Sequence, residues 1–187
     1  MLPRVALTVC SSILALAPAV HCQSTVQMRG DKCPLVDGEP FFAIGMYSVG
    51  AEALPMLADA GFNLVHTYAW EGKSDHEWGK EWLDAVQANG MKALVGLCRP
   101  RVKGMQFDQC QVRIRMYRDH PALLAWHTMD EPAWDKEGDT GKDYMPAAYR
   151  FVREHDPNHP VTAVTCHFDD PRKFEDSVDI MQADYYP

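Results

Sequence analysis

The stretch Trp82-Leu-Asp-Ala-Val-Gln-Ala-Asn-Gly-Met-Lys-Ala-Leu-Val-Gly-Leu97 joins a predicted helix to a predicted strand. Apolar residues at helical spacing come first, Asn89-Gly90 ends the helix, and an apolar run follows. The stretch Leu57-Ala-Asp-Ala-Gly-Phe-Asn-Leu-Val65 has the same order, with Gly61 in the equivalent place. A helix that ends in glycine and leads into an apolar strand, repeated after about 30 residues, is typical of a βαβ unit with a parallel sheet.

Two later units use proline as the boundary between a helix and a strand. His120-Pro121 and His159-Pro160 each precede an apolar run, because proline disfavours helix before it and opens the next strand. Near the N-terminus, Asp37-Gly38 predicts a tight hairpin turn. We predict strands near 41–47, 62–69, 92–98, 122–130, 161–166 and 178–185, and helices near 51–60, 76–89, 110–119, 142–155 and 171–176.

These elements predict an α/β fold, a (β/α)8 TIM barrel truncated after about six strands. The chain has 187 residues, whereas a complete eight-stranded barrel has about 250. An open, doubly wound sheet is the alternative, but neither GxGxxG nor GxxxxGK[ST] follows any predicted strand. We therefore favour the truncated barrel.

The net charge argues against a nucleic-acid partner, and the first residues predict where the protein is located. The chain carries 18 Lys+Arg against 26 Asp+Glu, so there is no basic field to attract phosphates, and we expect no nucleic-acid partner. Arg4 followed by the apolar run Val5 to Val20 predicts a signal peptide over 1–22, cleaved after Ala19 or Cys22. The run is too short to span a membrane, so we expect a secreted or periplasmic barrel over 23–187.

Four cysteines remain after removal of residues 1–22, and they allow three disulfide pairings. We favour a bridge between Cys98 and Cys110, because the Pro-, Arg-, Lys- and Gly-rich stretch between them reads as a loop. No cysteine or histidine has zinc-finger spacing. The sequence therefore predicts neither a metal nor another cofactor.

The active site of a parallel α/β fold lies where the strands end. Glu131 ends a strand that contains the apolar run Leu123-Leu-Ala-Trp126, so we expect a buried backbone there. Burial raises the pKa of a carboxyl and lets it hold a proton near neutral pH, as a general acid requires. The alternative is that Asp130-Glu131-Pro132 forms a solvated helix N-cap.

Four stretches, in this order, resemble the successive strand–helix joints of TIM-barrel glycoside hydrolases: Val36-Asp-Gly-Glu-Pro-Phe-Phe-Ala-Ile-Gly-Met-Tyr47, Leu57-Ala-Asp-Ala-Gly-Phe-Asn-Leu-Val65, Leu83-Asp-Ala-Val-Gln-Ala-Asn-Gly-Met-Lys92 and Leu124-Ala-Trp-His-Thr-Met-Asp-Glu-Pro132. The set includes the β-galactosidase/β-glucuronidase-like and cellulase-like retaining enzymes. The resemblance covers residues 36–187.

This resemblance implies a carbohydrate substrate and makes Glu131 the general acid/base. It also matches Asp184-Tyr185-Tyr186-Pro187 to the end of the sixth strand, where such enzymes often place an aromatic residue near the substrate. Strand-end position and the resemblance together predict the substrate contacts Tyr47, Tyr68, Trp70, His127, Asp130, Asp184 and Tyr185.

The sequence departs from the family pattern in two ways. Asp130 stands where the family commonly has asparagine, and an ionised carboxylate only accepts hydrogen bonds. Retaining enzymes also need a second carboxyl, which in these barrels comes from a seventh strand, and none is predicted here. The chain thus supplies one half of a catalytic pair, and the C-terminal half of the barrel is expected as its missing partner.

Two other functions stay open at this point. The chain is alternatively a noncatalytic carbohydrate-binding protein whose half-barrel assembles with another chain. It is otherwise a metal-dependent TIM-barrel hydrolase, with His66 and His127 as ligands beside Asp130 or Asp184.

Overall fold

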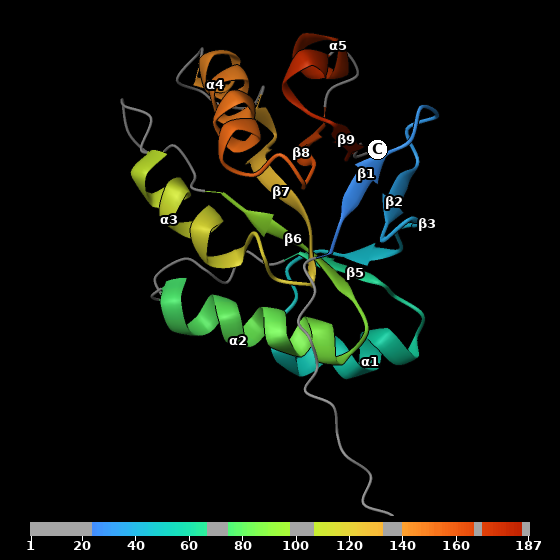
Figure 1. Cartoon of the computed structure of the whole chain (residues 1–187). Coiled ribbons are helices and arrows are strands. Elements are labelled where there is room, and N and C mark those ends of the chain that lie inside the picture. The colour runs from blue at the N-terminus through green and yellow to red at the C-terminus, as the bar shows by residue number, and fades with distance from the viewer. Residues whose placement is uncertain (1–23, 67–74, 98–106, 133–139, 167–169, 185–187) are drawn as a thin grey trace, which may run out of the picture.

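The computed structural model describes residues 24–66, 75–97, 107–132, 140–166 and 170–184. Its centre is a parallel sheet of six strands, each beside its neighbour in sequence (Figure 1). A barrel has this sequential order, whereas a doubly wound sheet reverses it. The curled sheet confirms the predicted truncated barrel. Its strands are β4 (Gly45–Met46), β5 (Leu64–His66), β6 (Lys92–Gly96), β7 (Leu123–Asp130), β8 (Val161–Thr165) and β9 (Ile180–Ala183).

Helices lie between successive strands and cover the outer face of the sheet (Figure 1). Gly61 (φ +89°) and Gly90 (φ +69°) follow the first two α-helices in the left-handed conformation that the sequence predicted. Among the described residues, no helix has both the length and the apolar character to cross a bilayer. The helices are η1 (Ala51–Ala53), α1 (Leu54–Asp59), α2 (Asp75–Ala88), α3 (Phe107–Tyr117), α4 (Thr140–His155), α5 (Asp170–Phe174) and η3 (Glu175–Ser177).

A short antiparallel hairpin sheet lies on the other side of the barrel sheet (Figure 1). Asp37 (φ +52°) and Gly38 (φ +87°) both have positive φ, as a two-residue type I′ hairpin turn requires. The Asp-Gly pair therefore predicted this turn correctly. The strands are β1 (Val26–Met28), β2 (Pro34–Val36) and β3 (Glu39–Pro40).

The hairpin covers the end of the barrel at which the strands begin. Val26 and Val36 pack in one apolar cluster with Leu94 and Leu124. Lys92, the first residue of β6, donates from Nζ to Ser24 Oγ at 2.8 Å and to the Pro121 carbonyl at 2.7 Å. The hairpin residues Asp31, Lys32 and Cys33 also line a cavity on the concave face of the barrel sheet.

The first barrel strand is much shorter than predicted. We expected a strand over 41–47, but β4 contains only Gly45 and Met46. The side chain of Asn63 takes the place of strand pairing before it, because Asn63 Oδ1 accepts from Ile44 N and Asn63 Nδ2 donates to Phe42 O, both at 2.8 Å. The amide thus satisfies backbone groups that a longer strand would have paired.

One buried carboxylate joins the outer layer to the sheet. Asp156, just after α4, accepts hydrogen bonds from Trp126 Nε1 at 2.7 Å and from His159 Nδ1 at 2.8 Å. Burial alone would raise the pKa of Asp156, but the His159 hydrogen bond and charge, with the Trp126 bond, outweigh it and lower that pKa. Asp156 therefore fixes Trp126 of β7 against the connection that leads into β8.

Replacing Asp156 by alanine should lower the free energy of unfolding by about 3 kcal/mol, because two buried donors then lose their acceptor. Urea denaturation followed by circular dichroism measures this change. Asp119→Ala is the matched control, because the Asp119 side chain is exposed and should change stability by less than about 0.5 kcal/mol. A loss below about 1 kcal/mol in the Asp156 variant would show that these two hydrogen bonds do not anchor Trp126.

The lowered pKa of Asp156 also predicts a pH dependence. A carboxylate with a lowered pKa in the folded state stabilises the fold above its unfolded pKa, about 3.9 for aspartate. This contribution disappears as the pH falls through the folded value. The stability difference between the wild type and Asp156→Asn should be constant from pH 5 to 7 and shrink below about pH 4. Urea titrations at several pH values test this, and a difference that grows on acidification would refute it.

Candidate active site

Three acidic residues lie at the ends of β7 and β9, on either side of β8. Asp130 is the last residue of β7, and Glu131 follows it and donates from its backbone N to the Val164 carbonyl at 3.0 Å. Asp184 follows β9 and donates from its backbone N to the Thr165 carbonyl at 2.8 Å. All three carboxylates are half-buried. Glu131 and Asp184 thus flank the end of β8, with their backbones about 10 Å apart at the usual strand spacing.

The backbone of Glu131 is strained. Its φ of +50° lies in the left-handed region, which costs a non-glycine residue about 1–3 kcal/mol. Ser48, just after β4, has the same feature with φ +58°. Such outliers concentrate at functional sites, where surrounding structure holds them. Asp130 belongs to the strand, Glu131 is left-handed, and Pro132 begins a helical turn, so the predicted alternative of a helix N-cap at Asp130-Glu131-Pro132 stays open.

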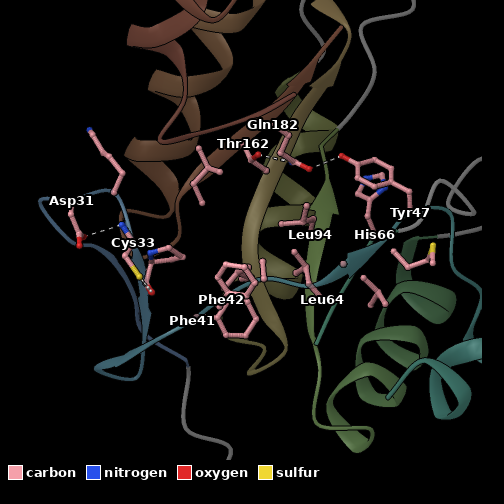
Figure 2. Close-up of a pocket in the computed structure, with 18 residues that line it drawn as sticks. Asp31, Cys33, Phe41, Phe42, Tyr47, Leu64, His66, Leu94, Thr162 and Gln182 are labelled. Atoms are coloured by element: carbon pink, nitrogen blue, oxygen red, sulfur yellow. Dashed lines mark hydrogen bonds between the residues drawn. The ribbon is translucent and has the colours of Figure 1, made fainter. Parts of the chain in front are cut away.

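A chain of hydrogen bonds crosses the inner face of the sheet near these carboxylates (Figure 2). The Tyr47 hydroxyl, just after β4, donates to Gln182 Oε1 in β9 at 2.9 Å. Gln182 Nε2 in turn donates to Thr162 Oγ1 in β8 at 2.7 Å. The first and last strands of the six-stranded sheet are therefore joined through their side chains.

Two histidines pack next to Tyr47. The ring centroids of Tyr47 and His66 are 4.7 Å apart, and those of His66 and His127 are 4.8 Å apart. His66 and His127 are exposed by only 2% and 4%, so they support the Tyr47 ring from within the barrel. The sequence placed them on neighbouring barrel positions, and the structure confirms this. No three His, Cys, Asp or Glu side chains within the described ranges are close enough together to hold a metal ion.

Two carboxylates lie near enough to Tyr47 to affect its pKa. Burial raises the pKa of the Tyr47 phenol most, and the negative charges of Asp130 and Asp184 raise it further. The hydrogen bond to Gln182 acts in the opposite direction and is the weakest of these effects. Tyr47 is therefore a neutral phenol at physiological pH, with the negative charges of Asp130 and Asp184 nearby.

Below this polar layer, the concave face of the sheet forms a cavity of about 570 Å³ (Figure 2). Its wall is mainly apolar, with polar groups from Tyr47, Gln182 and Thr162 at one side and the charged residues Asp31 and Lys32 of the hairpin also in its lining. Phe42 is 82% exposed beside it. The main apolar lining residues are Phe41, Phe42, Leu64, Leu94, Leu124 and Ile180.

The structure brings together five of the eight predicted site residues: Tyr47, His127, Asp130, Glu131 and Asp184. Tyr68, Trp70 and Tyr185 lie outside the described residues, as does Cys98 of the expected Cys98–Cys110 bridge. The sequence analysis missed Gln182 and Thr162. The available signal was a polar residue at 182 in an otherwise apolar strand, on the same face as Asp184 because side chains alternate.

No family model matches the chain. Two curated plant proteins are similar to short segments of it. Mannan endo-1,4-beta-mannosidase 2 of Oryza sativa subsp. japonica is 33% identical over 73 residues, or 38% of this chain and 16% of that protein. Putative mannan endo-1,4-beta-mannosidase 4 of Arabidopsis thaliana is 44% identical over 45 residues, or 23% of this chain and 11% of that protein. Short segments of the chain are thus similar to glycoside hydrolases. The chain spans less than a fifth of the length of these relatives.

Solved structures of glycosidases share the fold. A β-glucuronidase of Parabacteroides merdae superposes with a TM-score of 0.65 at 14% identity, over 87% of this chain and 23% of that one. A family 2 β-galacturonidase of Eisenbergiella tayi gives 0.63 at 17% identity, over 88% of this chain and 32% of that one. At these identities the likeness concerns the fold alone. The matched part makes up 23% and 32% of those two glycosidase chains.

The positive φ of Glu131 makes a prediction about two substitutions. Glu131→Gly should be more stable than Glu131→Ala by about 1 kcal/mol, because glycine adopts a left-handed backbone without a Cβ clash. Arg150 is the control, an exposed position inside α4, where alanine should be more stable than glycine by about 1 kcal/mol. Chemical denaturation of the four variants measures both differences. The same order at the two positions would show that Glu131 is unstrained.

Proposed function

We propose that the protein is a secreted glycoside hydrolase, acting on O-glycosidic bonds in oligo- or polysaccharides with Glu131 as the general acid/base. The observation that carries the proposal is the strained, half-buried Glu131 at the end of β7, beside Asp130 and across the end of β8 from Asp184. The similarity to glycoside hydrolases supports the reaction class. The apolar run after Arg4 supports secretion.

In this proposal, Glu131 protonates the glycosidic oxygen as the bond to the anomeric carbon breaks, so that the leaving sugar departs as a neutral alcohol. Positive charge then develops on the sugar ring. Asp130 and Asp184 stabilise it and hold the substrate hydroxyls, and Tyr47 completes the contact surface. His127 acts indirectly, because it is buried and supports the rings of His66 and Tyr47.

A second carboxyl must complete the reaction. A retaining enzyme places a nucleophile about 5–5.5 Å from the acid, and an inverting enzyme places a base about 6.5–9.5 Å away. We propose that the nucleophile belongs to strands that complete the barrel beyond β9, beside the partly exposed apolar residues near β4: Phe42, Ile44 and Met46. Asp184 is the alternative base for an inverting reaction. β-1,4-Mannan is the first substrate to test, given the two plant relatives.

Replacing Glu131 by glutamine in the natural chain that carries this sequence tests the acid role. Turnover of β-1,4-mannan oligosaccharides should fall by about 10²–10⁴, because the sugar leaving group needs a proton. Turnover of an activated aryl mannoside should fall much less, because its leaving group departs without protonation. Steady-state kinetics on both substrates measures the two losses.

The control is Glu175→Gln, an exposed glutamate in η3 whose replacement should leave both rates unchanged. Equal losses on the two substrates would remove the acid assignment from Glu131. Binding of mannan oligosaccharides without any turnover would instead favour the noncatalytic, carbohydrate-binding alternative.

A further inference from the structure

Gln182 is a polar side chain in the mainly apolar inner wall of the half-barrel. It comes from β9, and the apolar residues Leu94 and Ile180 line the same cavity (Figure 2). An amide among apolar side chains costs free energy unless its donor and its acceptor are both used. Both are used here, because the nitrogen donates to Thr162 Oγ1 at 2.7 Å and the oxygen accepts from the Tyr47 hydroxyl at 2.9 Å. These two bonds explain how the wall accommodates a glutamine at this position.

Thr162 anchors the nitrogen end of this amide. Thr162 is fully buried in β8, and its backbone carbonyl accepts a hydrogen bond from Thr128 Oγ1 of β7 at 3.1 Å. β8 lies between β7 and β9 in the sheet, so backbone pairing holds it on both sides. The Gln182 nitrogen is therefore bound to a buried inner strand, and the amide oxygen is directed to the Tyr47 side.

The bond to Gln182 sets the direction of the Tyr47 hydroxyl proton. The Tyr47 ring also packs against His66 and His127, with ring centroids 4.7 and 6.4 Å away. Ring packing places the ring, whereas the direction of the proton depends on its acceptor. A phenol has one proton, which Gln182 Oε1 accepts here, and its oxygen can accept a hydrogen bond at the same time. A sugar hydroxyl can therefore donate to Tyr47 while the Tyr47 proton stays with Gln182.

We propose that Gln182 is a positioning residue of the candidate active site, and that it holds the Tyr47 hydroxyl in the orientation that accepts a hydrogen bond from a sugar hydroxyl. This inference rests on the proposed function, in which Tyr47 contacts the substrate. Loss of Gln182 removes this acceptor, so the Tyr47 proton turns to another acceptor or to solvent. The Tyr47 oxygen then no longer meets the sugar hydroxyl in a single geometry, and the substrate binds more weakly.

Steady-state kinetics of the natural chain that carries this sequence, with β-1,4-mannotetraose as the substrate, tests the inference. Gln182→Met keeps the length of the side chain and removes both hydrogen bonds. It should raise KM about five- to tenfold and leave kcat within about twofold, because a contact made equally in the bound substrate and in the transition state affects KM alone.

Thr162 offers a second test one side chain farther from the substrate. Thr162→Val keeps the shape of the residue but removes the anchor of the Gln182 nitrogen, so it should raise KM about threefold or more. Thr162→Ser keeps the hydroxyl and should restore KM to within about twofold of the wild type. Thermal unfolding shows whether each variant is folded. If Gln182→Met does not fold, the two Thr162 variants decide the question.

A double variant shows whether Gln182 acts through the Tyr47 hydroxyl. Tyr47→Phe removes the hydroxyl and keeps the ring, so in this background Gln182→Met should change KM by less than about twofold. Gln111→Met is the matched control. It makes the same replacement at a glutamine in α3 whose Nε2 lies 3.0 Å from His155 Nε2, and it should leave KM unchanged.

The outcomes separate this inference from the proposed function. A lower stability or kcat at an unchanged KM in Gln182→Met would show that Gln182 supports only the fold. That result would overturn the inference and leave the glycoside hydrolase proposal intact. A further large rise of KM in the Tyr47→Phe background, or equal KM values for Thr162→Val and Thr162→Ser, would likewise overturn it. Absence of mannotetraose turnover in the wild type would contradict the proposed function, and the inference with it.

Discussion

The hydrogen bond between the Tyr47 hydroxyl and the Gln182 amide oxygen spans 135 residues of chain and joins the two outer strands of the parallel sheet. A side-chain bond between edge strands forms only if the sheet curls, because a flat sheet of six strands would hold its edges about 24 Å apart. The curl creates the concave face, and the concave face holds the polar layer and the cavity together. The geometry of the candidate site therefore follows from this closure.

The backbone is strained just past the end of β7, whereas the middle of this strand is held in the core. Trp126, in the middle of the strand, is buried and held by Asp156, whereas Glu131, just past its end, has a left-handed backbone. A strained residue persists only where its surroundings fix it. The anchored strand and the backbone hydrogen bond from Glu131 to Val164 provide that support. The candidate acid thus follows a strand whose middle is anchored in the core.

The similarity to glycoside hydrolases and the side chains of the candidate site give different information about this protein. Short segments of the chain are similar to plant mannanases, and its fold is shared with family 2 glycosidases. They leave the choice of sugar open, because the same barrel accommodates many substrates. The Thr162–Gln182–Tyr47 hydrogen bonds are a feature of this chain's own site, and they hold the Tyr47 side chain against the concave face of the sheet.

By itself, the sequence determined the order of the helices and strands of the barrel, the turn at Asp37-Gly38, the helix ends at Gly61 and Gly90, and the position of Glu131 just after a buried strand. These features depend on periodicity and on local backbone preference, which a sequence displays directly. Tertiary structure alone decided that Asn63 shortens β4 and that Gln182 fixes the Tyr47 proton. Such contacts join residues far apart in the chain, and their direction depends on how the sheet curls, which no local pattern records.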